Sequence, residues 1–329
     1  MATVPGTMRG VLIESTGGTE VLQYKTDIPV PEPKEGEILV KNYCIGINYI
    51  DIYFRTGLYP SPKPEILGRE AAGHIVALGP NAPTSFRLGD RVVYLGAGTY
   101  AEYSTTSAAK TALIPSSVSS SDAAASFLQG LTALTLVREA YPVKPGEFIL
   151  VHAAAGGTGL WLCQILKSIG ARTIGTVSTE AKAELARRNG AEFVVVYGRE
   201  DVVERVKEIT QGEGVAAVFD GVGKDTFEGD LEAVSRKGTV VTFGNASGPV
   251  PPFTISRLSA KNVKLARPML YNYIYTRGEF DHHTNELFRF IVEGKANIHV
   301  HEIYPLQDVA RAHTDLEGRK TTGKLLLKP

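Results

Sequence analysis

The sequence contains little cysteine and no excess of either charge. Only two cysteines, Cys44 and Cys163, occur in 329 residues, which excludes a disulfide framework and a zinc site built from cysteines. Lysine plus arginine and aspartate plus glutamate each number 35, so the formal net charge is zero. Because nucleic-acid-binding domains usually carry a basic excess, nucleic acid is not expected as the main partner.

Long apolar runs are absent as well. No stretch approaches the roughly 18 apolar residues that a membrane-spanning helix needs. Residues 1–6 show neither the basic start nor the apolar stretch of a secretory signal. We therefore expect no membrane partner and a cytoplasmic location, where two unpaired cysteines would stay reduced.

The pattern of residues changes near Ser121. Before it, short strands alternate with turns rich in Gly, Pro and Asn, and residues 48–57 are predicted as a short helix. After it, strands and helices alternate, which predicts an α/β fold with a doubly wound parallel sheet. The expected elements are strands 148–154, 172–177, 193–197, 216–220, 239–244 and 263–266, and helices 160–169, 181–189, 202–210 and 226–235.

The end of the chain shows a third pattern, with amphipathic helices expected at 276–293 and 306–317 and a closing strand at 324–327. These elements add no separate core, so we expect them to return to the β-rich region. The predicted domains are a discontinuous domain of residues 1–130 and 268–329 and an inserted dinucleotide-binding domain of residues 131–267.

A glycine-rich turn follows the first strand of the alternating region. An apolar strand, the residues Gly156, Gly157, Thr158 and Gly159, and the start of a helix follow in that order. Glycines let a backbone approach a pyrophosphate, and the free N–H groups of a helix N-terminus stabilise its charge. A tight turn without a ligand is the alternative interpretation. Within a βαβ series, the turn indicates a dinucleotide site.

The residue about 20 positions after the glycine turn separates NADH from NADPH. Enzymes that use NADH normally have an acid there to hold the ribose 2′-hydroxyl. Here the position is Ser178, with Lys182 one turn later and Tyr197 after the next strand. A hydroxyl, an ammonium and a phenol can all hydrogen-bond a 2′-phosphate, so we predict NADPH. The alternative for Lys182 is a solvated helix lysine.

Five runs, at residues 46–53, 55–60, 67–73, 152–159 and 244–248, together resemble the medium-chain dehydrogenase/reductase superfamily. Within it they are most similar to the quinone oxidoreductase, or zeta-crystallin-like, branch. The resemblance implies a Rossmann domain inserted into a β-rich, GroES-like catalytic domain, and a homodimer. It also places Asn48 and Arg69 where zinc-dependent relatives have a Cys and a His ligand. Asn is a poor zinc ligand and Arg cannot be one, so no metal is expected.

Without a Lewis acid to ionise an alcohol, acceptors that take up hydride readily are favoured. We therefore predict NADPH-dependent reduction of a quinone or another conjugated carbonyl. The resemblance assigns Asn48 and Tyr53 to catalysis at the nicotinamide end of an interdomain cleft, and Tyr53, Tyr59 and Gln129 to substrate binding. Wall residues without a proton role are the alternative for both tyrosines. The further cofactor contacts expected are Thr132, Phe243, Gly244, Asn245, Ser247, Arg319 and Lys324.

Three alternatives stay open at this stage. One is a 2-alkenal or enoyl reductase of the same superfamily, and another is an RNA-binding or structural crystallin-like protein. The third is a metal cluster formed by His282, His283, His299 and His301, although their spacing matches no strong metal-binding pattern and ordinary surface positions are favoured.

Overall fold

The computed structural model describes residues 4–329, which form two compact units. The prediction for the N-terminus concerns residues 1–6, of which 1–3 lie outside the described part. The β-rich unit comprises the described residues up to 128 with 276–292 and 298–329, and the parallel-sheet unit comprises 129–275 and 293–297. Sequence analysis places the second crossing at residue 268, whereas in the structure residues 268–275 belong to the parallel-sheet unit.

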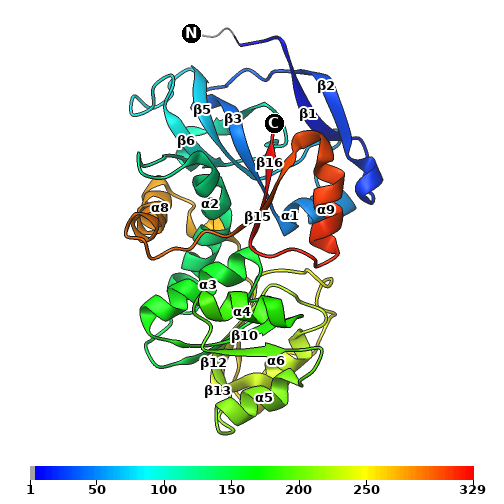
Figure 1. Cartoon of the computed structure of the whole chain (residues 1–329), viewed down its shortest axis with the longest axis vertical. Coiled ribbons are helices and arrows are strands. Elements are labelled where there is room, and N and C mark those ends of the chain that lie inside the picture. The colour runs from blue at the N-terminus through cyan, green and yellow to red at the C-terminus, as the bar shows by residue number, and fades with distance from the viewer. Residues whose placement is uncertain (1–3) are drawn as a thin grey trace. The chain divides into compact units, whose positions relative to one another are not determined.

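The parallel-sheet unit is built on six strands that are all parallel (Figure 1). Their order across the sheet is β11-β10-β9-β12-β13-β14. Successive strands are therefore added on one side of β9 up to β11 and on its other side from β12 onward, so the strand order reverses at the boundary between β9 and β12. This order confirms the predicted doubly wound fold, in which ligands bind at the carboxyl ends of the strands beside that reversal. The strands are β9 (Phe148–Val151), β10 (Arg172–Val177), β11 (Phe193–Val196), β12 (Val215–Asp220), β13 (Val234–Thr242) and β14 (Lys264–Ala266).

Helices connect these strands and bury their apolar faces against the sheet. Helices α3 and α4 pack on the half of the sheet with β9–β11, and α6 packs on β12 and β13. The side chains of Thr179 and Asp201 cap the N-termini of α4 and α5, as the sequence pattern at helix starts requires. The helices are α3 (Gly157–Ile169), α4 (Glu180–Arg188), α5 (Val202–Ile209) and α6 (Phe227–Ala233).

The junction between α6 and β13 differs from the prediction. We expected a helix to 235 and a strand from 239, but β13 already begins at Val234, where it pairs with Val215. The register then shifts, so that Ala217 pairs with Thr239. Lys237 in between adopts a positive φ of 68°, which is unusual for a residue with a side chain and cannot be read from the pattern of apolar residues.

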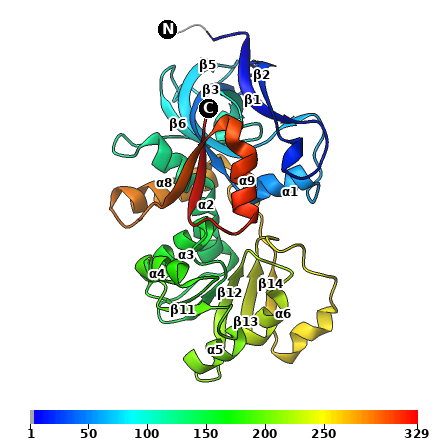
Figure 2. The same ribbon diagram turned by 45° about the vertical axis from the view of Figure 1, so that its right-hand side comes forward.

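The β-rich unit contains a seven-stranded and a three-stranded sheet (Figure 2). In the larger one, the last strand of the chain pairs antiparallel with β3, with Leu325 opposite Ile47. The two ends of the sequence therefore share one core, which contains Ile45, Tyr304 and Leu327. The strands are β1 (Thr7–Ile13), β2 (Gln23–Pro29), β3 (Glu37–Ile47), β4 (Glu65–Ile66), β5 (Glu70–Leu78), β6 (Arg91–Leu95), β7 (Tyr103–Ser107), β8 (Thr111–Leu113), β15 (Val300–Pro305) and β16 (Lys324–Lys328).

Among the remaining helices, α1, α8 and α9 correspond to expected helices and differ from them only at their ends. Helix α2 passes at Leu136 into a π-helical turn that ends at Ala140. Within residues 4–329, no helix is both long and apolar enough to cross a membrane. These helices are α1 (Tyr49–Thr56), α2 (Ser120–Thr135), α7 (Leu270–Tyr273), α8 (Arg277–Val292) and α9 (Val309–Glu317).

Candidate functional site

The glycine turn lies at the carboxyl end of β9, beside the reversal of strand order. Ala153 takes a positive φ of 51° to turn the chain, and α3 starts at Gly157 with no side chain capping it. A Cβ on Gly159 would lie 2.3 Å from the Ala153 carbonyl oxygen, so only glycine allows this approach of helix to strand. The uncapped N-terminus is the kind of anion site that a pyrophosphate occupies.

Gln129 covers the start of that helix. A Cβ on Gly157 would lie 2.0 Å from the Gln129 Oε1, so the glycine makes room for the amide. The same Oε1 is buried and accepts no hydrogen bond. A buried acceptor without a donor is costly unless a ligand supplies one. The residues at the turn thus fit a dinucleotide, because the N–H of its carboxamide could donate the hydrogen bond that Gln129 Oε1 lacks.

Two further loops meet next to the glycine turn, at the ends of β12 and β13. The Ser247 hydroxyl donates to the Val222 carbonyl at 2.9 Å and accepts from the Asp225 N–H at 3.0 Å. A Cβ on Gly244 would lie 2.3 Å from the Gly221 carbonyl oxygen. The structure thus brings the predicted residues Phe243, Gly244, Asn245 and Ser247 together in one loop at the correct end of the sheet.

The three residues expected at a 2′-phosphate follow β10 and β11. Ser178 comes directly after β10, Lys182 lies in the first turn of α4, and Tyr197 follows β11. The Tyr197 N–H donates to the Val177 carbonyl at 3.1 Å, so the ends of the two strands are adjacent. Two acids also lie here, and each is paired: Glu200, which accepts from the Val196 N–H, with Arg205 at 3.6 Å, and Glu180 with Arg187 at 2.9 Å. That pairing offsets the repulsion that a free carboxylate would exert on a phosphate.

In the β-rich unit, the predicted catalytic residues lie on or beside α1. Asn48 forms a capping box with Asp51 at the N-terminus of the helix and is buried. The rings of Tyr53 and Tyr59 contact edge to face, with centroids 5.1 Å apart, and the Tyr59 N–H donates to the Tyr53 carbonyl. Asn48, Tyr53 and Tyr59 therefore belong to one local structure, and Arg319 lies near it, beside Tyr49.

A buried ion pair adjoins Asn48. The Lys324 ammonium pairs with the Glu70 carboxylate and donates to Asn48 Oδ1 at 2.7 Å. Asn48 Nδ2 and the Leu128 N–H each donate to Glu70, at 2.8 and 2.7 Å. From the sequence we expected Lys324 to contact the cofactor, and Glu70 was not among the expected site residues. The sequence feature that could have indicated Glu70 is its position next to Arg69 in the run 67–73.

A second buried chain of hydrogen bonds leads from Asp51 to the surface. Tyr100 donates to Asp51 at 2.9 Å and contacts His313 Nε2 at 3.0 Å. Arg55 contacts His313 Nδ1 at 3.1 Å and pairs with Glu317. Burial raises the pKa of Asp51 to about 6, whereas burial and the Arg55 cation lower the pKa of His313 to about 3. His313 is therefore neutral, with Nδ1 accepting from Arg55.

The positions that bind zinc in relatives carry a different donor set. The Arg69 guanidinium stacks on the Phe54 ring, 3.9 Å from its centroid, and donates to Glu65 at 2.8 Å. A guanidinium has no lone pair for a metal, so these residues do not fit a catalytic zinc.

The predicted histidine cluster divides in two. His282, His283 and Glu286 bring their ligand atoms within 4.8 Å of one another. His299 and His301 instead contact the Thr322 hydroxyl, at 2.9 and 3.4 Å. The structure therefore does not bring the four histidines into one site.

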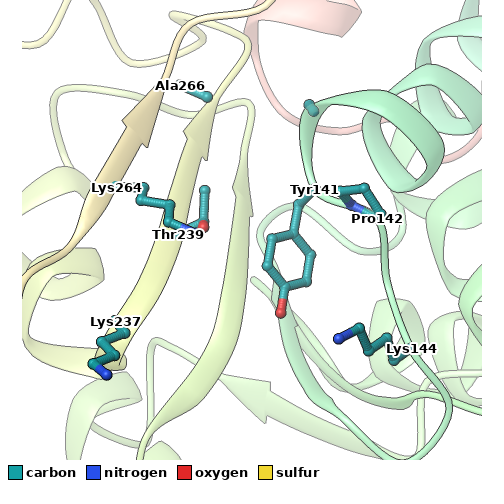
Figure 3. A pocket seen from close by; sticks show the side chains of 8 residues that line it. Tyr141, Pro142, Lys144, Lys237, Thr239, Lys264 and Ala266 are labelled. Atoms are coloured by element: carbon teal, nitrogen blue, oxygen red, sulfur yellow. The ribbon is translucent and has the colours of Figure 1, made fainter.

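A cavity of about 490 Å³ opens elsewhere in the parallel-sheet unit (Figure 3). It contains none of the predicted site residues, and its three lysines are exposed side chains of an ordinary solvated surface. The lining residues are Ala140, Tyr141, Pro142, Lys144, Lys237, Thr239, Lys264 and Ala266. The cavity is therefore separate from the glycine turns.

Comparison with known proteins gives consistent matches along the whole chain. Residues 34–116 match the alcohol dehydrogenase GroES-like domain, and residues 157–289 match the zinc-binding dehydrogenase family. The chain is 48% identical over 319 residues to a quinone oxidoreductase of Salmonella typhimurium, covering 95% of this chain and 97% of that one. It is 34% identical over 329 residues to a 2-haloacrylate reductase of a Burkholderia species, covering 97% and 98%.

A solved structure gives the same result. The Escherichia coli quinone oxidoreductase complexed with NADPH superposes with a TM-score of 0.95 at 46% identity, covering 98% of this chain and 100% of that chain. The predicted fold class and resemblance are both confirmed. The chain belongs to the quinone oxidoreductase, zeta-crystallin-like branch of the medium-chain dehydrogenase/reductase superfamily.

Proposed function

We propose that this protein is a zinc-independent NADPH:quinone oxidoreductase. The proposal rests on the two groups of residues described above. One is a glycine-lined dinucleotide site with Ser178, in place of an acid, at the end of its second strand. The other is an α1 region in which Asn48 and Arg69 replace metal ligands. Hydride transfer without a Lewis acid requires an acceptor that is already electrophilic, as a quinone is.

In this proposal the parallel-sheet unit holds the cofactor, which supplies hydride from its nicotinamide ring. The N–H groups at the start of α3 would bind the pyrophosphate, and Gln129 would orient the carboxamide through its buried Oε1. Ser178, Lys182 and Tyr197 would receive the 2′-phosphate. Arg319 and Lys324 remain predicted contacts from the β-rich unit. The Lys324 ammonium already serves Asn48 and Glu70, so its nearer role is to hold Asn48 in place.

The β-rich unit supplies the residues proposed for the acceptor. Tyr53 and Tyr59 offer aromatic surface for a flat ring. The Tyr53 hydroxyl would donate a hydrogen bond to the acceptor oxygen as it gains negative charge. Asn48, fixed by Lys324 and Glu70, would orient the reacting rings relative to each other.

The alternative acceptor is an activated alkene. The 34% identity to a 2-haloacrylate reductase favours it, since that relative is named for a conjugated carboxylate. Both reactions need the same hydride donor and differ in the shape of the acceptor. A panel of 1,4-benzoquinone, 9,10-phenanthrenequinone and a 2-alkenal, each with NADPH, would separate them. A higher kcat/KM for the alkenal than for both quinones would overturn the quinone assignment.

The cofactor assignment has its own test. We expect titration of cofactor fluorescence, with chelator-treated protein, to show tighter binding of NADPH than of NADH and full activity. A preference for NADH, or activity that returns only with added Zn²⁺, would contradict the proposal.

The proposal also includes a homodimer that is located in the cytosol. Strand β14 is the last strand at one edge of the parallel sheet (Figure 2), and such an edge can pair with a second copy. Sedimentation equilibrium should give twice the chain mass of 35.4 kDa. A mass of one chain at micromolar concentration would rule this out.

A further inference from the structure

A buried histidine lies between β9 and the glycine turn, and the proposed reaction does not use its chemistry. His152 is the first residue after β9. Its Nε2 lies 2.7 Å from Asp230 Oδ1 on α6, and its Nδ1 lies 2.9 Å from the Thr176 hydroxyl on β10. All three residues are at least nine-tenths buried. The ring therefore connects β9 to its neighbouring strand and to a helix on the other half of the sheet.

A second carboxylate completes the cluster from β12. Asp220 is the last residue of that strand, and it accepts hydrogen bonds from the N–H groups of Val222, at 2.7 Å, and Gly223, at 3.0 Å. The ligand atoms of His152, Asp220 and Asp230 lie within 4.8 Å of one another. Since the Val222 carbonyl accepts from the Ser247 hydroxyl, the cluster also supports the loops that follow β12 and β13.

The charges of the cluster favour a protonated histidine. Asp230 Oδ2 is buried and has no hydrogen-bond partner, so a neutral His152 would leave two buried carboxylates with no cation. Burial by itself lowers the pKa of His152, but the charge and hydrogen bond of Asp230, together with the charge of Asp220, outweigh burial and raise that pKa. Burial, followed by the charge of Asp230, raises the pKa of Asp220 to about 6.

We propose that His152, held by Asp230, is a positioning residue for the dinucleotide, fixing the glycine turn and placing a buried positive charge beneath the bound phosphates. The inference rests on the proposed function, because it concerns how that cofactor is held. Neither His152 nor Asp230 was among the site residues expected from the sequence.

A metal ion is the competing occupant of such a cluster, and the geometry disfavours it. Both ring nitrogens of His152 are already in hydrogen bonds of 2.7 and 2.9 Å. A zinc ion would need a lone pair on one nitrogen and about 2.0 Å to each ligand, which requires one of these contacts to open.

The sign of the pH dependence follows from the raised pKa. The cation is present below the pKa of His152 and is lost as the pH rises through it, so NADPH affinity should fall with rising pH. The charged groups that face the ring are Asp230 on α6 and Asp220 on β12, while Thr176 on β10 is uncharged. Measurements from pH 6.5 to 9 lie on the alkaline side of the Asp220 pKa of about 6.

The test compares wild type with Asp230→Asn and His152→Gln, which keep hydrogen-bonding groups but remove one charge each. We expect the wild-type Kd for NADPH to rise about tenfold across this pH range, as a buried charge near phosphates would produce. In Asp230→Asn the rise should begin at lower pH, because burial then dominates the His152 pKa. In His152→Gln the Kd should be raised at pH 6.5 and nearly independent of pH.

The control is Glu192→Gln, which removes a carboxylate from the same unit before β11, where Glu192 pairs with Arg172. Its profile should match that of wild type. Profiles of Asp230→Asn and wild type that coincide would overturn the inference, even if the variant has a lower Tm. If neither variant folds, NMR of wild type with ¹³Cε1-labelled histidine decides, since NADPH should raise the His152 pKa and an unchanged value would refute the idea. Failure of wild type to bind NADPH would instead refute the proposed function.

Discussion

Each unit buries a histidine in a polar cluster, and the two histidines have opposite charge behaviour. His152 in the parallel-sheet unit faces two carboxylates, and its pKa is raised. His313 in the β-rich unit faces Arg55, which together with burial lowers its pKa to about 3. Both rings are almost fully buried, so burial alone does not decide the charge. The charge of the neighbouring side chain therefore decides whether a buried imidazole is a cation.

The largest effect is expected where a buried cation is removed outright. Lys324→Met leaves the Glu70 carboxylate buried with only neutral donors, from Asn48 and Leu128. Breaking one side of such a pair costs about 3–5 kcal/mol, measured as the free energy of unfolding in urea. Lys320→Met, at an exposed position of the same unit, should change it by less than about 0.5 kcal/mol.

A matched double variant tests whether the lost stability comes from the unpaired Glu70 charge. Lys324→Met with Glu70→Gln removes both charges and should recover part of the lost stability. If Lys324→Met alone is as stable as wild type, the β-rich network contains no essential buried charge, and the contrast between the units fails.

The second prediction concerns His313 and pH. Its folded-state pKa of about 3 lies below the ordinary value of 6.5, so the unfolded chain binds the extra proton first. Its neutral form contributes stability above pH 6.5 that is lost as the pH falls toward 3. Between pH 6.5 and 5, wild type should lose about 2 kcal/mol more than His313→Gln.

Burial raises the pKa of Asp51 to about 6, but Asp51 is present in both proteins. The difference in unfolding free energy between wild type and His313→Gln therefore reports on His313. Urea unfolding at several pH values measures it. Parallel pH curves would show that His313 is not neutral in the folded protein and would remove the contrast with His152.

The third prediction compares two tyrosines that contact each other. Tyr53→Phe should lower kcat with a quinone by about tenfold, because the hydroxyl no longer supports the developing charge, while Tm stays within a few degrees. Tyr59→Phe keeps the aromatic contact and serves as the control. Equal kinetics for Tyr53→Phe and wild type would leave both tyrosines as wall residues.

The smallest effect is expected at the cofactor phosphate. Lys182→Ala should weaken NADPH binding about three- to fivefold and leave NADH binding unchanged, since an ion pair at a partly exposed side chain contributes at most about 1 kcal/mol. The ratio of the two Kd values, with Lys207→Ala as a control on the next helix, measures this. Equal losses for both cofactors would place Lys182 away from the 2′-phosphate.

Sequence reasoning captured the features with strong local signals. The Gly156–Gly159 turn and the helix start at Asn48 depend on residues within one turn of each other, and the absence of an acid at Ser178 depends on a fixed spacing from that turn. The apolar runs located every strand of the parallel sheet to within a few residues. The start of β13 was misplaced because its bulge depends on pairing with β12, which no local pattern contains.

The class of fold, the kind of cofactor site and the replacement of metal ligands could be inferred before the fold was known, because they depend on residue type and on spacing along the chain. Which charges meet depends on the folded chain. Lys324 and Glu70, or His152 and Asp230, are far apart along the chain and are joined by strand pairing and helix packing. Electrostatic interactions depend on distance in space, so the charge of each buried histidine follows from the folded neighbours and not from its place in the sequence.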